Sequence, residues 1–219
     1  MIPDNFQRGA EATCHQKRRH QMLLRLCRDL CGETLDYGCG YGDITHLLSG
    51  QLDIQGVDVG VERVKFARQQ YPELQFYVCD SSGTGFKATT FDVVVSSVVI
   101  PFVPNPEEYL REIHRLLKPD GALVIASKNV DVVRDRVRTL VGRGHVKGAL
   151  HIMTAGDLEK LLCKVGFEVE SRDYFFDPPF DSCKNAADLC FGALQTLGAL
   201  ARISSWAEYY GFRARAIKG

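Results

Sequence analysis

Two patterns of hydrophobic and polar positions alternate along most of the chain. Short runs of apolar, often β-branched residues predict buried strands, and between them apolar residues recur every three or four positions, as in amphipathic helices. The predicted strands of this part lie at 33–35, 54–58, 74–79, 91–97 and 122–126. Regular alternation of strand and helix is typical of an α/β fold, in which helices cover both faces of a mostly parallel sheet.

The last third of the chain departs from this alternation. Residues 167–176 predict a sixth strand, and 209–217 predict a seventh that follows without the usual crossover length. We therefore expect an α/β, Rossmann-like three-layer sandwich with a seven-stranded sheet in the order 3-2-1-4-5-7-6, in which only the last strand is antiparallel. Asn105 and Thr154 are predicted helix caps, and Gly166 is a predicted helix stop.

Two segments stand outside the alternating pattern, and we expect them to form a substrate cap on a single domain over residues 1–219. Residues 128–153 contain a predicted helix and are rich in arginine, whereas 183–203 predict a largely apolar helix. Ligands of open parallel sheets bind at the carboxyl ends of the strands, where insertions select the substrate. The two segments together suggest an amphipathic small molecule with an acidic group. A solvated basic face and an ordinary core helix fit the pattern equally well.

The most distinctive motif lies between the first predicted strand and the helix after it. Residues 34–43 read T-L-D-Y-G-C-G-Y-G-D, in which three glycines alternate. A strand, a glycine loop and a helix N-terminus together form a nucleotide-cofactor site. The spacing differs from the dinucleotide fingerprint G-x-G-x-x-G, and the carboxylate of Asp36 would repel a pyrophosphate but suits a cationic ligand. The expected cofactor-binding residues of this loop are Asp36, Tyr37, Gly38, Cys39, Gly40 and Asp43.

Polar residues also stand at the tips of the following strands. Asp58 ends the second strand and is followed by Val59. A carboxylate at this tip can accept hydrogen bonds from a ribose diol. We expect the tips of the third and fourth strands to line the same pocket with Asp80, Ser81, Ser96 and Ser97.

The glycine loop resembles motif I of class I S-adenosylmethionine-dependent methyltransferases. Residues 92–126 are similar to the type-11 methyltransferases, which include quinone-biosynthesis enzymes. The resemblance implies S-adenosyl-L-methionine as the cofactor, with Asp80 near its adenine amino group. It also implies methyl transfer to an oxygen, nitrogen or carbon nucleophile of a small molecule. Pro101 and Phe102 stand where many relatives carry histidines, so the role of those histidines does not carry over to this chain.

Composition narrows the partners and the setting. The 27 Lys and Arg residues balance 27 Asp and Glu residues, which gives no global electrostatic reason to expect nucleic acid. The eight cysteines show no repeated C-x-x-C spacing, so we expect reduced thiols, no metal and a cytoplasmic protein. No apolar run approaches the roughly 18 residues that span a bilayer. Asp177–Phe180 match the D-P-P-F box of DNA methyltransferases but lie far from the fourth strand, where that box belongs, so we do not expect DNA as a substrate.

A general base is needed only where the methyl acceptor must lose a proton before it attacks. His145, His151 and Tyr174 lie on segments expected at the substrate side, and they are the catalytic candidates. Two rival interpretations stay open at this point. One is an RNA or protein methyltransferase that uses the basic stretch 134–147, and the other is a non-catalytic domain that binds S-adenosylmethionine. We expect a monomer or a homodimer.

Overall fold

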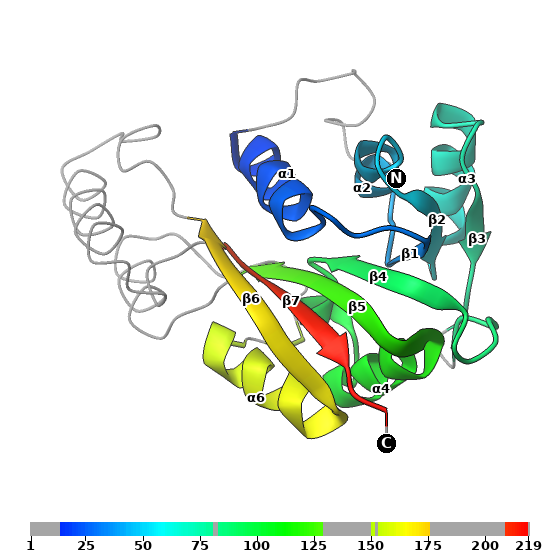
Figure 1. Ribbon diagram of the computed structural model, residues 1–219. Helices are drawn as coiled ribbons and strands as arrows, with labels where there is room; N and C mark the ends of the chain where they lie inside the picture. Colours follow the sequence, from blue (N-terminus) through cyan, green and yellow to red (C-terminus); the bar gives the residue numbers. More distant parts are fainter. Residues whose placement is uncertain (1–13, 81–82, 129–149, 152, 176–208, 219) are drawn as a thin grey trace, which may run out of the picture.

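The chain folds around one seven-stranded sheet. The computed structural model describes residues 14–80, 83–128, 150–151, 153–175 and 209–218 (Figure 1). The strand order is β3-β2-β1-β4-β5-β7-β6, and β7 runs antiparallel to both of its neighbours while the other pairs are parallel. The predicted strand order and the antiparallel last strand are therefore confirmed. The strands are β1 Glu33–Tyr37, β2 Asp53–Asp58, β3 Phe76–Val78, β4 Phe91–Ser97, β5 Leu117–Lys128, β6 Phe167–Phe175 and β7 Tyr209–Ala216.

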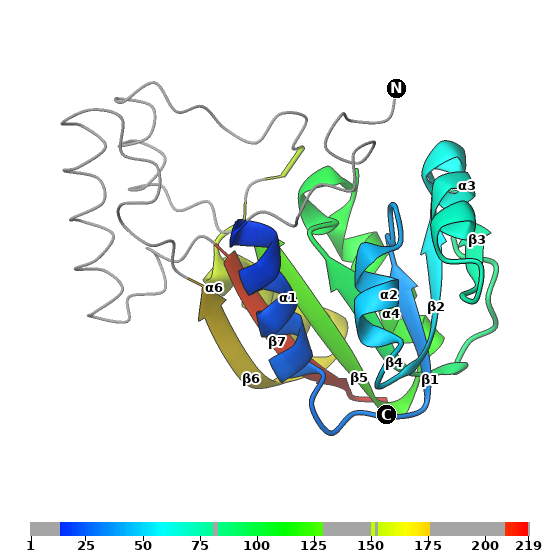
Figure 2. The same cartoon turned by 90° about the horizontal axis from the view of Figure 1, so that it is seen from above.

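Helices cover both faces of the sheet, as the alternating pattern predicts (Figures 1 and 2). One face carries three helices, which are α1 (Cys14–Leu26), α2 (Asp43–Leu48) and α3 (Val61–Gln70). The other face carries α4 (Pro106–Leu116) and α6 (Ala155–Val165), and the short 3-10 helix η1 (Ile100–Phe102) follows β4. The three-layer sandwich is confirmed.

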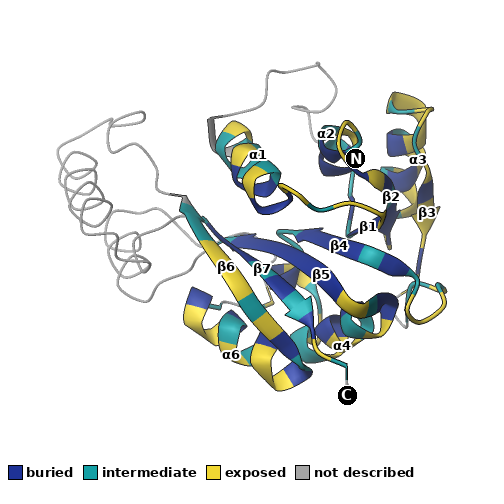
Figure 3. Cartoon of the chain, in the orientation of Figure 1, coloured by how far each residue is buried: buried dark blue, intermediate teal, exposed yellow. Residues whose placement is uncertain are grey.

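The hydrophobic core forms on both sides of the central strands. Successive side chains of a strand point to opposite faces. Val94 and Leu123 thus pack with α4 and α6, whereas Val93 and Val124 pack with α1 and α2. Burial is nearly continuous along β4, β5 and β7, whereas the two edge strands, β3 and β6, are largely exposed (Figure 3). The polar ends of these central strands therefore stand out as the exceptions.

The predicted helix ends are confirmed. The Asn105 side chain accepts hydrogen bonds from the N–H groups of Glu107 and Glu108 at the start of α4. Thr154 and Asp157 form a reciprocal capping box at the start of α6, and Gly166 ends that helix with φ 101°. These local signals depend on residues a few positions apart, which is why the sequence carries them.

Two elements are shorter than predicted. The third strand, expected over 74–79, spans only Phe76–Val78, because this edge strand pairs with β2 alone. The first helix, expected over 13–30, ends at Leu26, and Asp29 adopts a left-handed φ of 65° in the turn that follows. The segment 83–90 between β3 and β4 contains no helix.

The predicted substrate cap lies mostly outside the described residues. Of the segment 128–153, the structure describes Lys128, Leu150, His151 and Met153, and it describes none of 183–203 or of Asp177–Phe180. The cap and the single-domain boundaries stay predictions. No helix in the described part of the chain is long and apolar enough to cross a membrane.

Candidate cofactor site

The glycine loop closes on itself at the carboxyl ends of β1 and β2. The N–H groups of Gly38 and Cys39 both donate to the Val57 carbonyl oxygen, at 2.8 and 3.0 Å, and Gly42 N–H donates to the Cys39 carbonyl. The loop backbone is thereby fixed against β2. At this edge of an open α/β sheet, a ligand is expected.

Two of the three glycines are required by packing. Gly38 has φ 88°, and a Cβ there would lie 2.3 Å from a methyl carbon of Val99. Gly42 has φ 89°, and a Cβ there would lie 2.9 Å from the ring of Phe76. Both positions combine a left-handed backbone with a close neighbour, so only glycine fits.

Gly40 differs, because it faces open space. Its φ is 56°, and among the described residues no atom beyond its own chain neighbours lies within 4 Å of the position that a Cβ would occupy. Its N–H donates to Asp58 Oδ2 at 3.0 Å, which ties the middle of the loop to the tip of β2. Packing within the protein does not explain the missing side chain here. A ligand that approaches the loop closely does explain it.

Asp58 is the most heavily hydrogen-bonded carboxylate at this edge. The residue is 6% exposed, and Oδ1 accepts from Gly60 N–H at 2.7 Å. The same oxygen accepts from Arg63 Nε at 3.0 Å and from Arg63 Nη2 at 2.6 Å. The sequence predicted Asp58 but missed Arg63. A basic residue in the first turn of the helix that follows an acidic strand tip is the signal that could have found it.

Asp36 is buried below the loop. It is 1% exposed, and Oδ2 accepts the Thr45 hydroxyl at 2.7 Å. Burial raises the pKa of Asp36 to about 7, with a smaller contribution from the charge of Asp58, while the Thr45 hydroxyl and Arg19 oppose the shift. A carboxylate that is costly to ionise alone favours a cation beside it. This agrees with the cationic ligand expected from the sequence.

The two serines at the tip of β4 have different surroundings. Ser96 is fully buried, and its hydroxyl lies 2.9 Å from the hydroxyl of Tyr109, which also donates to the Tyr37 carbonyl. Ser97 points to the opposite face, and its buried hydroxyl has no hydrogen-bond partner. Val98 then adopts φ 60°, which is strained for a β-branched residue. Of the two, only the Ser97 hydroxyl is without a hydrogen-bond partner among the described residues.

The other expected cofactor residues surround the loop. Val59 is 54% exposed beside Asp58, and the Asp80 carboxylate accepts from Gly83 N–H at 3.2 Å. Cys39 is buried, and burial raises the pKa of its thiol far above the ordinary value, so it acts as an apolar side chain. Asp43 accepts a long hydrogen bond of 3.4 Å from the Tyr71 hydroxyl. Ser81 lies outside the described residues.

Of the three catalytic candidates, the structure describes His151 and Tyr174. His151 Nε2 lies 2.9 Å from the Pro104 carbonyl oxygen, so Nε2 is the protonated nitrogen and Nδ1 is the acceptor in neutral histidine. Tyr174 packs against the core cluster on the α6 side and lies on β6, which three strands separate from β1. His145 lies outside the described residues. The backbone N–H of His151 donates to the carbonyl oxygen of Pro101 in η1, so His151 lies near the end of the central strand β4.

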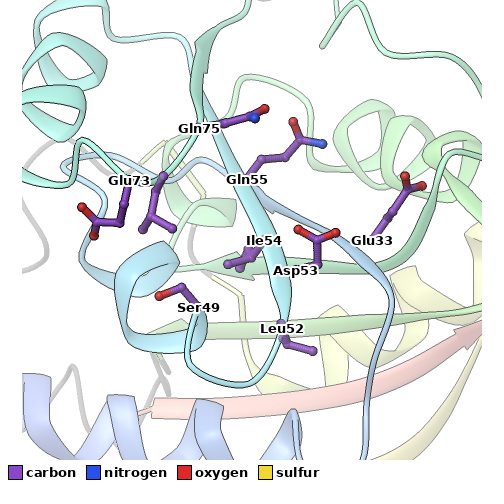
Figure 4. Close-up of a pocket in the computed structure, with 9 residues that line it drawn as sticks. Glu33, Ser49, Leu52, Asp53, Ile54, Gln55, Glu73 and Gln75 are labelled. Carbon is purple, nitrogen blue, oxygen red and sulfur yellow. The ribbon is translucent and has the colours of Figure 1, made fainter.

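A depression of about 510 Å³ lies at the opposite edge of the sheet (Figure 4). Its walls come from the amino ends of β1 and β2 and from the turn before β3, and they include the carboxylates of Glu33, Asp53 and Glu73. No group of three metal-ligating side chains occurs within the described part of the chain. The glycine loop, at the carboxyl edge, is the candidate site.

Comparison with known proteins agrees with this location. The methyltransferase domain family matches residues 35–125, from β1 through β5. This matched region is similar to the class I S-adenosylmethionine-dependent methyltransferases. The matched region contains the glycine loop, Asp58 and the tip of β4, so the family resemblance and the site geometry rest on the same residues.

Two relatives that are at least 32% identical to this chain match over less than half of it. It is 32% identical over 100 residues to the 2-methyl-6-phytyl-1,4-hydroquinone methyltransferase of Synechocystis, which covers 43% of this chain and 31% of the relative. It is 34% identical over 105 residues to the mitochondrial ubiquinone biosynthesis O-methyltransferase of Rattus norvegicus, which covers 43% and 30%. The match spans about a third of the length of each relative.

A solved structure extends the likeness to most of the fold. The S-adenosylmethionine-dependent methyltransferase from Methanosarcina mazei superposes with a TM-score of 0.63, over 85% of this chain and 93% of that chain. The two sequences are 20% identical. At this identity the likeness shows the fold alone, and the function of this chain has to be argued from its own residues.

Proposed function

We propose that the protein transfers a methyl group from S-adenosyl-L-methionine to an oxygen, nitrogen or carbon nucleophile of a small molecule. The observation that carries the proposal is the junction between Gly40 and Asp58. A glycine that faces open space there donates its N–H to a buried carboxylate at the next strand tip. This arrangement offers a close backbone approach and a ribose acceptor within one hydrogen bond of each other.

The residues of the loop fit the separate parts of this cofactor. Asp58 would accept the ribose hydroxyls, and Asp36 would stabilise the positive charge of the amino acid end. Exposed apolar side chains beside Asp58 would contact the adenine ring, and Asp80 would accept from its amino group. These apolar side chains are Val59, Val61 and Val78.

The cofactor supplies a methyl group already activated by its sulfonium, so the protein mainly holds the acceptor in line with it. The groups that could hold the acceptor lie at the strained end of β4 and in η1, which follows it. Ser97 offers an unpartnered hydroxyl, and Phe102 offers an exposed ring. His151 can take a proton at Nδ1, because its Nε2–H bonds the Pro104 carbonyl.

The acceptor class follows from the segments that flank the site. The arginine-rich segment 128–153 and the apolar segment 183–203 favour an amphipathic molecule with an acidic group, consistent with relatives named for hydroquinone and ubiquinone methylation. We also infer a cytoplasmic protein that acts as a monomer or homodimer. None of the described residues favours RNA or protein as the acceptor.

Calorimetry with S-adenosylmethionine and S-adenosylhomocysteine tests the cofactor assignment. We expect one site per chain, with the product bound at least as tightly as the cofactor. A screen of small acidic and phenolic molecules with methyl-labelled cofactor then tests turnover. Absence of binding would refute the function, whereas binding without transfer to any small molecule would favour a non-catalytic domain or a macromolecular acceptor.

A further inference from the structure

Arg63 already pairs with Asp58, the carboxylate to which the proposed function assigns the ribose hydroxyls. Arg63 donates twice to Asp58 Oδ1, at 3.0 and 2.6 Å, and Gly60 N–H donates to the same oxygen at 2.7 Å. Gly40 N–H donates to Oδ2 at 3.0 Å. Asp58 therefore holds four donor contacts before a ligand arrives.

The remaining capacity of Asp58 is too small for a diol. A carboxylate has about four lone-pair sites on its two oxygens. Three donors crowd Oδ1, and Oδ2 keeps room for one more. Two ribose hydroxyls need two acceptor sites, so one of them must take the place of Arg63. The main-chain N–H groups of Gly40 and Gly60 are fixed by the loop and by the start of α3, which leaves the arginine as the group that can move.

Arg63 has room to move. Its side chain is 43% exposed, whereas that of Asp58 is 8% exposed. The guanidinium lies against Gly60, where a Cβ would come within 2.6 Å of the Arg63 Cζ. The absence of a side chain at Gly60 thus opens the position in which Arg63 neutralises the nearly buried carboxylate.

We propose that Arg63 is a resident competitor for the ribose subsite and a determinant of its specificity. It pairs with Asp58 in the cofactor-free protein, and a nucleoside with both the 2′ and 3′ hydroxyls displaces it. A nucleoside with one hydroxyl needs only the open site on Oδ2 and leaves Arg63 in place. The inference rests on the proposed function, because it takes Asp58 as the ribose acceptor.

Calorimetry with S-adenosylhomocysteine compares the wild type with Arg63→Met, which keeps most of the aliphatic stem but removes both donors. This ligand has no net charge, so loss of a positive side chain has little direct effect on it. We expect Arg63→Met to bind about three- to tenfold more tightly. The preference for S-adenosylhomocysteine over its 2′-deoxy analogue should rise by a similar factor, because the analogue uses only the open site on Oδ2 and does not displace Arg63.

Lys65→Met is the matched control. Lys65 lies on the same helix and pairs with Glu62 at 2.8 Å, and the variant also removes one positive charge. Its affinity should equal that of the wild type. Arg63→Lys, which keeps the charge without the two-pronged contact, should fall between the wild type and Arg63→Met.

The competitor role of Arg63 and the cofactor assignment are refuted by different results. If the wild type binds S-adenosylhomocysteine and folded Arg63→Met binds equally or more weakly, Arg63 orients Asp58 and the competitor proposal is wrong. If neither the wild type nor Arg63→Met binds, although both melt as folded proteins, the cofactor assignment fails and this inference fails with it. Binding by Arg63→Met alone would support both.

Discussion

Gly40 separates cofactor binding from folding more cleanly than its neighbours do. Gly40→Ala places a methyl group in open space at φ 56°, so the fold should lose only about 1–2 kcal/mol from the left-handed backbone. The same methyl group would block the approach of a ligand, and affinity for S-adenosylhomocysteine should fall at least about tenfold. Gly38→Ala is the contrast, because its Cβ would meet Val99 and lower the melting temperature. Unchanged affinity in Gly40→Ala would remove this loop from the site.

Asp36 predicts a pH-dependent affinity. Its pKa of about 7 means that it is partly protonated near neutrality and must lose a proton to face a cation. We expect the affinity of the wild type for S-adenosylmethionine to rise between pH 6 and pH 8, by up to about tenfold per pH unit at the low end. Asp36→Asn should bind weakly with no such trend. Calorimetry in several buffers checks this, and a rise of equal size in Asp36→Asn would assign the effect to another group.

Single residues also show how far the sequence alone can reach. Asp36, Gly40 and Asp58 follow from strand tips and glycine spacing, both of which are local patterns. The partner Thr45 follows from the orientation of its side chain after folding, which no spacing reveals. Arg63 was missed although its position in the first turn after Asp58 could have indicated it. Ser96 and Ser97 are adjacent and identical in type, yet only the register of β4 separates a core hydrogen bond from a free hydroxyl.

The capping box of α6 gives a prediction at the scale of one element. Thr154→Ala removes the hydroxyl that accepts from Asp157 N–H and donates to its carboxylate, and it should cost about 1 kcal/mol of unfolding free energy. Gly156→Ala in the same turn should instead add about 0.5–1 kcal/mol, because alanine is the better helix former. Urea unfolding measures both variants. Neither should change cofactor affinity, and a change would show that α6 couples to the loop.

The ends of helices and strands were predicted best where they depend on a few consecutive residues. Helix caps and the β-branched strand β4 emerged with accurate ends, since each depends on a few consecutive residues. The edge strand β3 came out shorter than its alternating pattern suggested, because a strand with one partner loses pairing at its ends. The helix α1 ended early at a left-handed Asp29, a conformation that aspartate adopts without a distinctive neighbour pattern.

At the scale of the whole molecule, Asp36 sets an unusual dependence of stability on pH. Its folded-state pKa lies above the ordinary value of 3.8, so the folded protein binds this proton more tightly than the unfolded chain. The stabilising contribution is therefore complete below about pH 4 and is lost as pH rises through about 7. Asp36→Asn should match the wild type at pH 4 and exceed it by about 1–3 kcal/mol at pH 8 without cofactor.

Chemical denaturation of the two proteins across this range measures the difference directly. Taking the difference cancels the carboxylates whose pKa is lowered by ion pairs, such as Asp92 and Glu159, since both proteins share them. A variant that is less stable than the wild type at pH 8 would mean that Asp36 is ionised and well compensated in the folded protein.

The overall topology was predictable because strand order follows from few rules. Regular crossovers fix the first five strands, and a final strand without a crossover must enter antiparallel. The proposed acceptor-binding segments 128–153 and 183–203 could not be placed in the same way. Their composition suggests a chemistry, but their sequences have no periodic relation to the strands of the sheet.

The position of β7 has a consequence for how the protein is made. Residues 209–216 leave the ribosome after all the other strands of the sheet. They nevertheless pair with both β5 and β6 in the interior of the sheet (Figure 1). Until they emerge, β5 has an open edge and β6 has no strand to join. Tyr210 and Phe212, both fully buried, arrive last to complete the core. A nascent chain that stalls before residue 209 should therefore present exposed strand edges to chaperones and proteases.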